Sequence, residues 1–385
     1  MELTWITCLG LFFSMLGVAY TILVERYRQV WEKMPEWEIP PGYVPGVMIS
    51  VVIPARNEAA GIGACLESLL RQGYPAHLFE VLVVDDDSSD ETAAIALQVA
   101  DSRISVLRPP VTPLPQGFVA YKKRALETGI SKAKGELILT TDADCVLPPH
   151  WLELMASCYE RKGWHGITGP VAFQEEASLF ERFQSLDLLG MMLITGAGMR
   201  MGLTHLANGA AFGFSKAAFE AVGGYSEISR LASGDDLLLL HKIMARYPGQ
   251  TGFLKTAQPV RTQALGSLIA FFRQRVRWGT KSKSYSDWKI TAVLALVFFL
   301  CWSIFLSLAL LFWLPWYWLT IPAFLISSKA WADYRMLRSA ARFFGRNDLV
   351  NVFWPAQALH ILYIAWVGLA SNLVGSYKWK GRRVK

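Results

Sequence analysis

Long stretches without a charged residue restrict this chain's fold more than any other feature. They run from Leu3 to Val24, from Ile290 to Leu314 and from Leu349 to Ser376. A helix needs about 20 apolar residues to cross the hydrocarbon core of a bilayer, and helices satisfy all their backbone hydrogen bonds internally. The overall composition, 53% hydrophobic, is high for a soluble enzyme. We therefore expect part of the chain to lie in a membrane.

The number of membrane crossings is less tightly constrained. The first stretch lacks a basic start and a small-residue cleavage site, so we interpret it as an anchor rather than a signal peptide. A shorter apolar segment, 316–331, is interrupted by Pro322 and Lys329. Counting it as a crossing gives one N-terminal and three C-terminal spans. We expect this arrangement, in the cell (inner) membrane, with the domain after the first helix in the cytoplasm.

The positive-inside rule does not settle the side of the C-terminal tail. Four crossings keep the basic segment 335–346 inside but place the basic tail 377–385 outside. If segment 316–331 instead enters and leaves the membrane on the same side, the tail 377–385 lies inside but the basic segment 335–346 lies outside. The side of the tail therefore stays open.

Charge and cysteine usage exclude several classes of protein. The net charge is +7, and the basic residues cluster beside the apolar stretches, which suits phospholipid headgroups better than nucleic acid. The five cysteines have no CxxC or zinc-like spacing. We expect reduced thiols, with no disulfide or zinc framework.

Between residues 47 and 260 the pattern becomes that of an α/β domain. The short β-branched runs VMISVVIPA and FEVLVVDDD are separated by a segment with apolar residues at helical spacing. Strands that alternate with helices predict parallel pairing, right-handed crossovers and a doubly wound sheet. Ligands of such sheets bind outside the carboxyl ends of the strands, where this sequence has PARNE, DDDSSD and TDADC.

The segment TDADC suggests what this edge binds. If the strand before it continued, Asp142 and Asp144 would point to one face, and a cation would be expected beside them. Carboxylates gathered at the ends of parallel strands suit Mg²⁺ or Mn²⁺, which uses one or two of them together with substrate phosphates. The chain has no P-loop motif, and no GxGxxG follows its first strand. These features together indicate a nucleotide-sugar.

The ordered motifs SVVIPARNE, VVDDDSSDET, TDADC, NGAAF, SGDD and RQRVRW resemble those of a known family. The chain is similar to the membrane-bound family 2 glycosyltransferases, the group of cellulose, chitin and hyaluronan synthases and ceramide glucosyltransferases. The resemblance implies an α/β, GT-A-like, doubly wound mixed-sheet domain, inserted between one N-terminal and about three C-terminal transmembrane helices. The expected parts are an anchor (1–28), a cytoplasmic GT-A domain (29–260), an interfacial helix region (261–289), transmembrane helices (290–376) and a basic tail (377–385).

The resemblance also implies a donor site. Its residues near the base and ribose would be Pro54, Arg56, Asn57, Glu58 and either Asp85 or Asp86. Lys122 would lie near the diphosphate, Asp142 would face the nucleotide, and Asp144 together with Asp142 would hold the metal. Without the resemblance, Lys122 and Lys123 are also compatible with an exposed helix face.

For catalysis, the resemblance implies Asp236 as general base and Asp235 as its acidic neighbour. Gln274, Arg277 and Trp278 reproduce the QxxRW motif, which in the family closes over the diphosphate and borders the acceptor. Arg273, Arg275 and Arg277 are also compatible with a basic collar beside the membrane. The sequence departs from the common pattern with Arg56 in place of tyrosine and Glu127 in place of asparagine.

The expected function is an inverting, metal-dependent transfer of a sugar from a nucleotide-sugar, UDP-linked by preference, to a lipid or lipid-linked acceptor. The alternative is a processive polysaccharide synthase of the hyaluronan, cellulose or poly-N-acetylglucosamine type, whose pore a second copy or a partner subunit would complete. A third possibility is a protein that binds a nucleotide-sugar but catalyses no transfer. The segment 178–206 is either an interfacial segment near the acceptor or a core helix.

Overall fold

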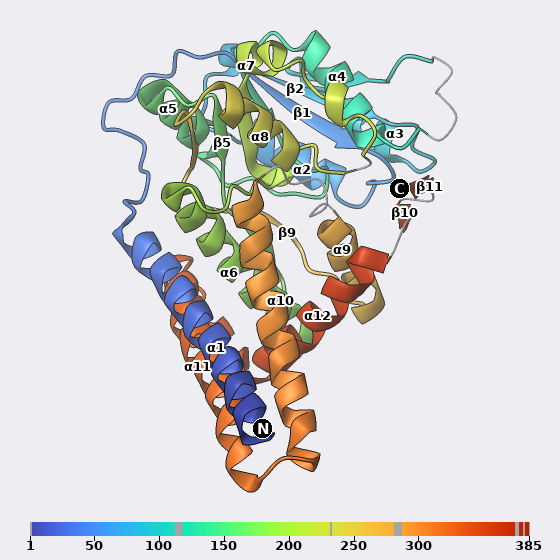
Figure 1. The fold of residues 1–385 in the computed structure, drawn as a ribbon. Helices are drawn as coiled ribbons and strands as arrows, with labels where there is room; N and C mark the ends of the chain where they lie inside the picture. Colours follow the sequence, from blue (N-terminus) through green and yellow to red (C-terminus); the bar gives the residue numbers. More distant parts are fainter. Residues whose placement is uncertain are drawn as a thin grey trace. The chain divides into compact units, whose positions relative to one another are not determined.

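A computed structural model describes residues 2–111, 118–231, 233–280, 287–373, 377–379 and 382–384. Figure 1 shows the fold and labels many of its elements. The chain divides into two compact units. The α/β unit comprises Pro35–Glu175, His205–Gln263 and Gly375–Lys385, and the helical unit comprises Met1–Met34, Glu176–Thr204 and Ala264–Val374. The predicted domain boundaries stay predictions.

The α/β unit is built on a seven-stranded mixed sheet with the order β3-β2-β1-β4-β7-β5-β8. The strands are β1 (Ile49–Ala55), β2 (Phe79–Asp85), β3 (Ile104–Leu107), β4 (Leu137–Thr140), β5 (Gly166–Thr168), β7 (Phe212–Ser215) and β8 (Thr251–Phe253). β1 pairs in parallel with β2 and β4, and β2 with β3. β7 runs antiparallel to both β4 and β5. The predicted doubly wound mixed sheet is confirmed.

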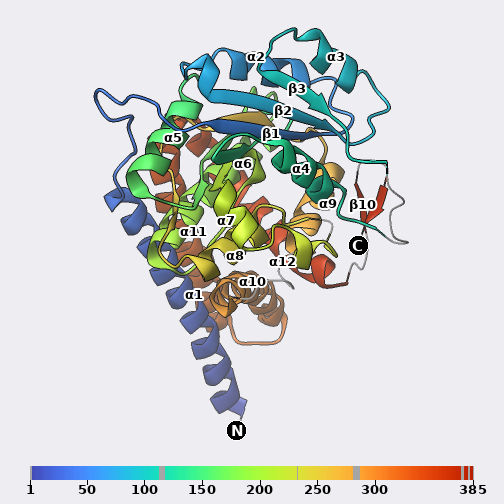
Figure 2. The ribbon, with the colours of Figure 1, turned by 90° about the horizontal axis from the view of Figure 1, so that it is seen from above.

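Helices cover both faces of the first strands. The helices of this unit are α2 (Ile62–Leu70), α3 (Thr92–Gln98), α4 (Tyr121–Lys132), α5 (Trp151–Lys162), α7 (Lys216–Ala221) and α8 (Leu237–Arg246). α2 and α3 lie on one face of β1–β3 and α4 on the other, as right-handed crossovers require (Figure 2). Val51, Val52 and Ile53 of β1 are therefore fully buried, which explains why this strand is apolar without alternation.

Two smaller sheets complete the described strands of the α/β unit. β6 (Val171–Gln174) and β9 (Val260–Gln263) pair in parallel. β10 (Tyr377–Trp379) and β11 (Arg382–Val384) form an antiparallel pair.

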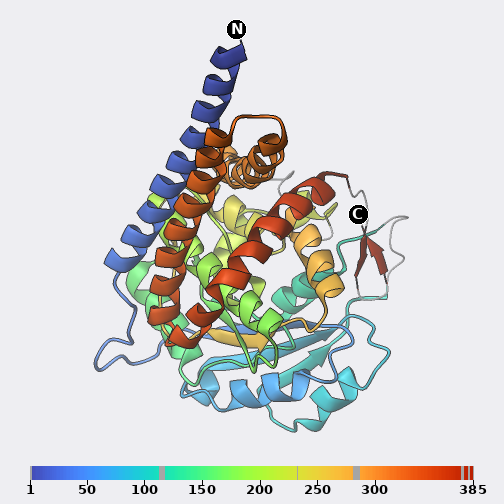
Figure 3. The same cartoon turned by 90° about the horizontal axis from the view of Figure 1, so that it is seen from below.

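The helical unit contains the apolar stretches. Its helices are α1 (Glu2–Lys33), α6 (Leu179–Met201), α9 (Leu268–Gly279), α10 (Trp288–Ala309), α11 (Thr320–Phe343) and α12 (Phe353–Leu373). Among the described residues, three helices are long and apolar enough to cross a membrane: Trp5–Lys33, Trp288–Phe312 and Asn347–Leu373. α11 packs along α1 (Figure 3) but carries more charge and is not among the three. The segment 178–206, for which two interpretations were open, contains α6, and its residues up to Thr204 belong to this unit.

Charged residues inside the helical unit are paired with one another. Lys329 and Asp333 of α11 are 0% and 4% exposed, and the ammonium of Lys329 donates to the carboxylate of Asp333. The Tyr20 hydroxyl donates to the same carboxylate, as does Gln357 Nε2 at 2.9 Å. Ionisable groups in apolar surroundings are tolerated when they face the protein interior and find partners. This cluster links α1, α11 and α12, and it explains why α11 interrupts its apolar pattern.

Removing one member of this pair should destabilise the helical unit. Asp333→Ala leaves the Lys329 ammonium buried without its counter-charge, which costs about 3–5 kcal/mol for a buried pair. Lys329→Met combined with Asp333→Leu should recover much of that stability, because no charge stays buried. Thermal unfolding in detergent measures both effects.

The control for this comparison is Arg71→Ala, which breaks a pair with Glu67 whose side chains are 73% and 63% exposed. It should change stability by less than about 1 kcal/mol. An Asp333→Ala variant as stable as this control would contradict the role given to the buried pair.

Candidate active site

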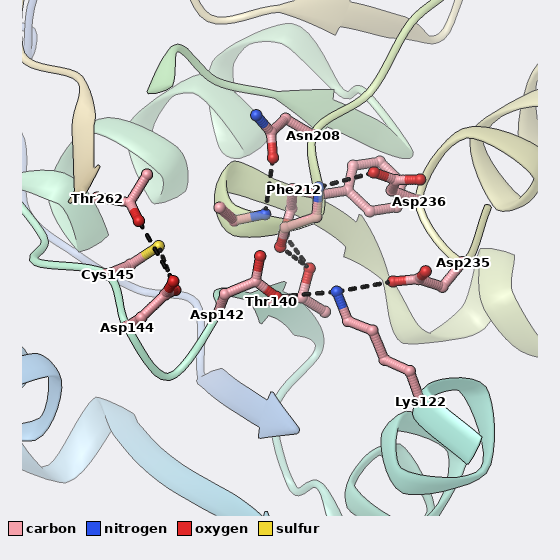
Figure 4. Close-up of polar contacts among 12 residues, drawn as sticks. Lys122, Thr140, Asp142, Asp144, Cys145, Asn208, Phe212, Asp235, Asp236 and Thr262 are labelled. Carbon is pink, nitrogen blue, oxygen red and sulfur yellow. Dashed lines mark hydrogen bonds and ion pairs between the residues drawn. The ribbon is translucent and has the colours of Figure 1, made fainter. Parts of the chain in front are cut away.

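The loops at the carboxyl ends of β1, β2 and β4 and the segments before β7 and α8 together form the candidate active site. Figure 4 shows its centre, where Lys122 of α4 lies between carboxylates from different loops. Parallel strands bring their carboxyl ends to one edge of the sheet, so residues far apart in sequence meet there. The structure thus brings the predicted segments together at this edge, and ligand binding there stays a prediction.

Asp142 and Asp144 lie in a turn rather than on a strand. β4 ends at Thr140, and the Cys145 N–H donates to the Asp142 carbonyl at 3.1 Å. The Asp142 carboxylate turns to Lys122, whereas Asp144 turns to Thr262 of β9, whose hydroxyl donates to it at 3.4 Å (Figure 4). The expectation that both carboxylates point to one face is wrong, because the two-residue period of a strand does not apply after Thr140.

Lys122 is the cation expected beside the paired carboxylates. Its Nζ lies 2.8 Å from Asp142 Oδ1 and 3.3 Å from Asp235 Oδ2. Burial lowers the pKa of Lys122, but the charges of Asp142, Asp235 and Asp236 outweigh burial and hold this pKa well above its usual value. Its side chain is only 23% exposed, so the exposed-face interpretation of Lys122 is wrong.

Asp236 is held in a defined orientation by backbone groups. It is the N-cap of α8, and its Oδ1 accepts the N–H of Leu237 at 2.7 Å. Its Oδ2 accepts the N–H of Gly209 at 2.9 Å. Asp235, beside it, is 7% exposed. The two carboxylates therefore face the same cluster but have different partners.

Gly209 forms one wall of this cluster. A Cβ at this position would lie 3.4 Å from Lys122 Nζ, 3.5 Å from Asp235 Oδ2 and 3.7 Å from Asp236 Oδ2. The Thr140 hydroxyl donates to the Gly209 carbonyl at 2.9 Å and so ties this wall to the end of β4. A larger residue at 209 would fill the space beside the carboxylates.

The loops after β1 and β2, which hold the predicted base-binding residues, are joined by hydrogen bonds. Arg56 donates to the carbonyls of Asp86 and Asp87, and the Ser89 N–H donates to Asn57 Oδ1 at 2.8 Å. Asn57 has a φ of 53°. The Glu58 N–H donates to Thr92 Oγ1 at 2.8 Å. The structure thus brings most of the predicted set together.

Asp85, one of the two acids predicted to lie near the base or ribose, is buried and has polar partners within the unit. It is 2% exposed, accepts the Ser88 N–H at 3.2 Å and lies 3.4 Å from Arg108 Nε. Asp86 is 6% exposed. Pro54 is half-buried at the end of β1. The roles of these residues toward a nucleotide stay predictions.

The carboxylates fit a divalent cation that completes its coordination with substrate oxygens. Asp144 is exposed, and it accepts from the Thr262 hydroxyl at 3.4 Å and from the Cys145 thiol at 3.6 Å. Within the described ranges, no three His, Cys, Asp or Glu side chains gather into a full metal site. Mg²⁺ is usually bound by one or two carboxylates together with substrate phosphates. Asp144 is therefore better placed than Asp142, which pairs with Lys122.

The QxxRW motif lies on α9 of the helical unit, so its predicted place over the diphosphate stays a prediction. Within the motif, Arg275 is 4% exposed and donates to Asp187 Oδ2 of α6 at 2.9 Å. Its guanidinium also stacks 4.4 Å from the ring centroid of Trp278. Arg275 therefore does not belong to a solvent-exposed basic segment beside the membrane. Gln274 Oε1 is buried without a hydrogen-bond partner among the described residues.

The thiols beside the carboxylates are structural. Burial raises the pKa of Cys65 and of Cys145, and the charges of Asp142 and Asp144 raise both further. Both side chains are buried, and all five cysteines are free in this structure. A thiol held protonated in this way is a poor nucleophile.

Sequence reasoning missed several residues of the site. Gly209 lies in the quoted motif NGAAF, which was a usable signal, but Thr262 and Gly61 carried none. Gly61 is the N-cap of α2, and a Cβ there would lie 2.8 Å from Asp144 Cα. The loop after β1 thus supports the turn that carries Asp144. Lys123 was noted only with Lys122, although it is buried.

Gly61→Ala should therefore destabilise the α/β unit by about 1–3 kcal/mol, because the Asp144 backbone must move. Gly63, on the same helix, is the matched control: a Cβ there meets Ile95 Cγ2 at an ordinary 3.6 Å. Gly63→Ala should be neutral or stabilising by up to about 1 kcal/mol. Thermal unfolding compares the two variants, and equal stability would contradict the close approach at Gly61.

Comparison with known proteins identifies the family. The model for glycosyl transferase family group 2 matches residues 137–367, and that for glycosyl transferase family 2 matches residues 50–223. A β-monoglucosyldiacylglycerol synthase of a Synechocystis species is 26% identical over 61% of this chain and 48% of that protein. An undecaprenyl-phosphate 4-deoxy-4-formamido-L-arabinose transferase of Yersinia enterocolitica is 29% identical over 40% of this chain and 45% of that protein. The chain thus spans about half the length of these relatives.

A solved structure supports the fold. The mannosyltransferase PcManGT from Pyrobaculum calidifontis, in complex with GDP-Man and Mn²⁺, superposes with a TM-score of 0.56 at 17% identity, covering 96% of this chain and 98% of that one. This likeness, together with the mixed sheet, confirms the GT-A-like fold. The family model covers more than half of the chain, and the chain therefore belongs to the family 2 glycosyltransferases.

Proposed function

We propose that this protein is a membrane-embedded, metal-dependent, inverting glycosyltransferase. It moves a sugar from a nucleotide-sugar to a lipid or lipid-linked acceptor, with the α/β unit in the cytoplasm. The observation that carries the proposal is the cluster of Lys122, Asp142, Asp235 and Asp236, with Asp144 exposed nearby. A structural role alone gives no reason to hold three carboxylates around one lysine at the ligand-binding edge of a sheet.

Asp236 is the proposed general base. The acceptor hydroxyl oxygen attacks the anomeric carbon from the face opposite the leaving group, and its proton passes to the Asp236 carboxylate. The bond from the anomeric carbon to the diphosphate oxygen breaks, and the nucleoside diphosphate leaves with the electron pair. The N–H groups of Leu237 and Gly209 orient the carboxylate for this transfer.

Lys122 is proposed to offset the charge of the departing diphosphate. Its raised pKa keeps the ammonium charged in the pH range in which such an enzyme works. A fixed cation near developing negative charge lowers the barrier most where water is partly excluded. Mg²⁺ or Mn²⁺, when held by Asp144 with or without Asp142, would add Lewis-acid stabilisation of the same charge.

The donor is proposed to be a UDP-sugar held by the loops after β1 and β2. These loops are joined through Arg56 and Asn57, which supports a common base-binding surface. The GDP-mannose in the structurally similar mannosyltransferase makes a guanosine donor the natural competitor. The donor assay therefore includes both nucleotides.

The acceptor is proposed to be a lipid. The names of two relatives refer to a glucosyldiacylglycerol and to undecaprenyl phosphate, both of them membrane lipids. Three helices of this chain are long and apolar enough to cross a membrane, which would hold the α/β unit close to such an acceptor. Phospholipid contact by the basic clusters beside these helices belongs to the same proposal.

Removing the carboxylate of Asp236 and removing that of Asp144 should have different effects on the reaction. Asp236→Asn keeps a helix-capping side chain, because asparagine caps as well as aspartate, so the fold should persist. It should lower kcat by about 10²–10⁴-fold, because the base is lost, with donor affinity nearly unchanged. Asp144→Asn should weaken donor binding, and more so at low Mn²⁺.

Titration of donor binding against Mn²⁺, beside initial rates, separates the two effects. Glu67→Gln, at an exposed position on α2, is the control and should alter neither quantity. Full activity in Asp236→Asn would remove it as the base and leave it a helix cap.

The direct test of function uses purified full-length protein in detergent with Mg²⁺ or Mn²⁺, a panel of labelled UDP-sugars and GDP-mannose, and a total lipid extract. Label in a small organic-soluble product is the expected result, and the donor that supplies it names the nucleotide. Label in a high-mass water-soluble product would replace the proposal by a processive synthase. Donor binding without transfer under all conditions would indicate a silent binder.

A further inference from the structure

A second lysine on α4, Lys123, turns away from the Lys122 cluster and is almost completely buried, with 1% of its surface exposed. Its Nζ lies 2.7 Å from the carbonyl oxygens of Ile228 and Leu231 and 3.0 Å from that of Ser233. An ammonium group has three N–H donors, so these three acceptors match its full capacity. Consecutive helical residues point about 100° apart, which lets Lys122 contact Asp142 and Asp235 while Lys123 binds carbonyls earlier in the loop that carries Asp235.

The three carbonyls belong to the loop that leads directly into the proposed catalytic pair. After a short 3₁₀ turn, Ser226–Ile228, the chain reaches Asp235 and Asp236 through Gly234, whose φ is 81°. A surface loop normally satisfies its carbonyls with water and tolerates movement. Here three of them converge on one internal cation, so the loop is tied to α4.

The start of the same loop is also held by charged groups. Lys242 Nζ of α8 donates to the Gly224 carbonyl at 2.8 Å. Burial raises the pKa of Glu127, one turn after Lys123, while a hydrogen bond from the Tyr225 backbone lowers it, as do the charges of Lys123 and Lys242. α4 thus holds the loop at both ends, through Glu127 and Lys123, and carries Lys122 into the site.

We propose that Lys123 is a positioning residue for Asp235 and Asp236. By fixing the backbone of Ile228, Leu231 and Ser233 on α4, it sets the distance between the carboxylates that follow and Lys122 on the same helix. If the loop moved, the general base would leave the reach of the acceptor hydroxyl while the donor site at Asp142 and Asp144 stayed intact. The catalytic part of this inference rests on the proposed function of Asp236.

The test compares Lys123→Met with Lys216→Met in the full-length protein in detergent. Lys216 is the matched control because its Nζ also donates to a backbone carbonyl, that of Ala133 at 2.8 Å, at the opposite end of α4. Hydrogen exchange followed by mass spectrometry reports on peptides covering 224–240, with β1 and β2 as reference. Initial rates with the donor identified above give kcat and KM.

Lys123→Met should speed exchange in 224–240 and leave β1 and β2 unchanged. It should also lower kcat by about 10- to 100-fold, the effect expected of a displacement near 1 Å, with the donor KM within about threefold. Lys123→Arg, which keeps N–H donors, should recover part of both losses. Lys216→Met should change neither.

Three results would overturn the inference. They are unchanged exchange in 224–240, faster exchange throughout the α/β unit, and an unaltered kcat despite a loosened loop. Unchanged exchange would make Lys123 an ordinary packing residue, and faster exchange throughout the unit would make it a general core residue. An unaltered kcat despite a loosened loop would show that the position of the loop does not affect catalysis. If the wild type transfers no sugar, the proposed function fails on its own assay, while the exchange comparison still decides whether Lys123 holds the loop.

Discussion

The attraction between Lys122 and the carboxylates around it is the interaction on which the site depends. Asp142, Asp235 and Asp236 come from two loops, and like charges brought together repel unless a cation lies among them. Lys122 supplies that cation from α4, with 2.8 Å to Asp142 and 3.3 Å to Asp235. Through this one ammonium the turn after β4 is joined to the loop before α8. A metal and a diphosphate would enter a site whose charges are already partly balanced.

The same rule governs the helical unit, where several charged side chains are buried. Lys329 and Asp333 are buried together, and Arg275 is buried with Asp187, whose second oxygen accepts the Tyr363 hydroxyl at 3.0 Å. The Arg275 pair joins α9 to α6, and the Lys329 pair, which lies within α11, is linked to α1 and α12 through Tyr20 and Gln357. Polar contacts therefore add specificity to packing that apolar surfaces alone define poorly. The Arg275 pair also fixes α9, the helix that carries Gln274, Arg277 and Trp278. The QxxRW motif is therefore anchored by Arg275, which occupies one of its two variable positions.

Predictions that rest on short sequence patterns are correct, whereas those that depend on where a strand ends or on tertiary contacts are wrong or were not made. Alternation of apolar runs predicted β1, β2 and β4 with their parallel pairing, and uncharged runs predicted α1, α10 and α12. The paired direction of Asp142 and Asp144 was wrong because it required β4 to extend past Thr140. The mixed character of the sheet was expected only from the family resemblance, and neither the resemblance nor the residue pattern identified β7 as the antiparallel strand. The roles of Lys122 and Lys123 could not be distinguished from sequence, since they are adjacent lysines in the same helix.

The sequence by itself determined which segments are apolar helices, which are buried strands, and at which edge of the sheet the acidic motifs gather. These follow from periodicity, length and the geometry of parallel strands, all of which act over short distances along the chain. Only the tertiary structure decided which carboxylate meets which cation. Lys122 and Asp235 are separated by more than a hundred positions in sequence, and Lys123 meets carbonyls just as remote. Such contacts depend on how helices and loops pack in three dimensions. The type of a side chain does not by itself indicate which remote residue it will contact.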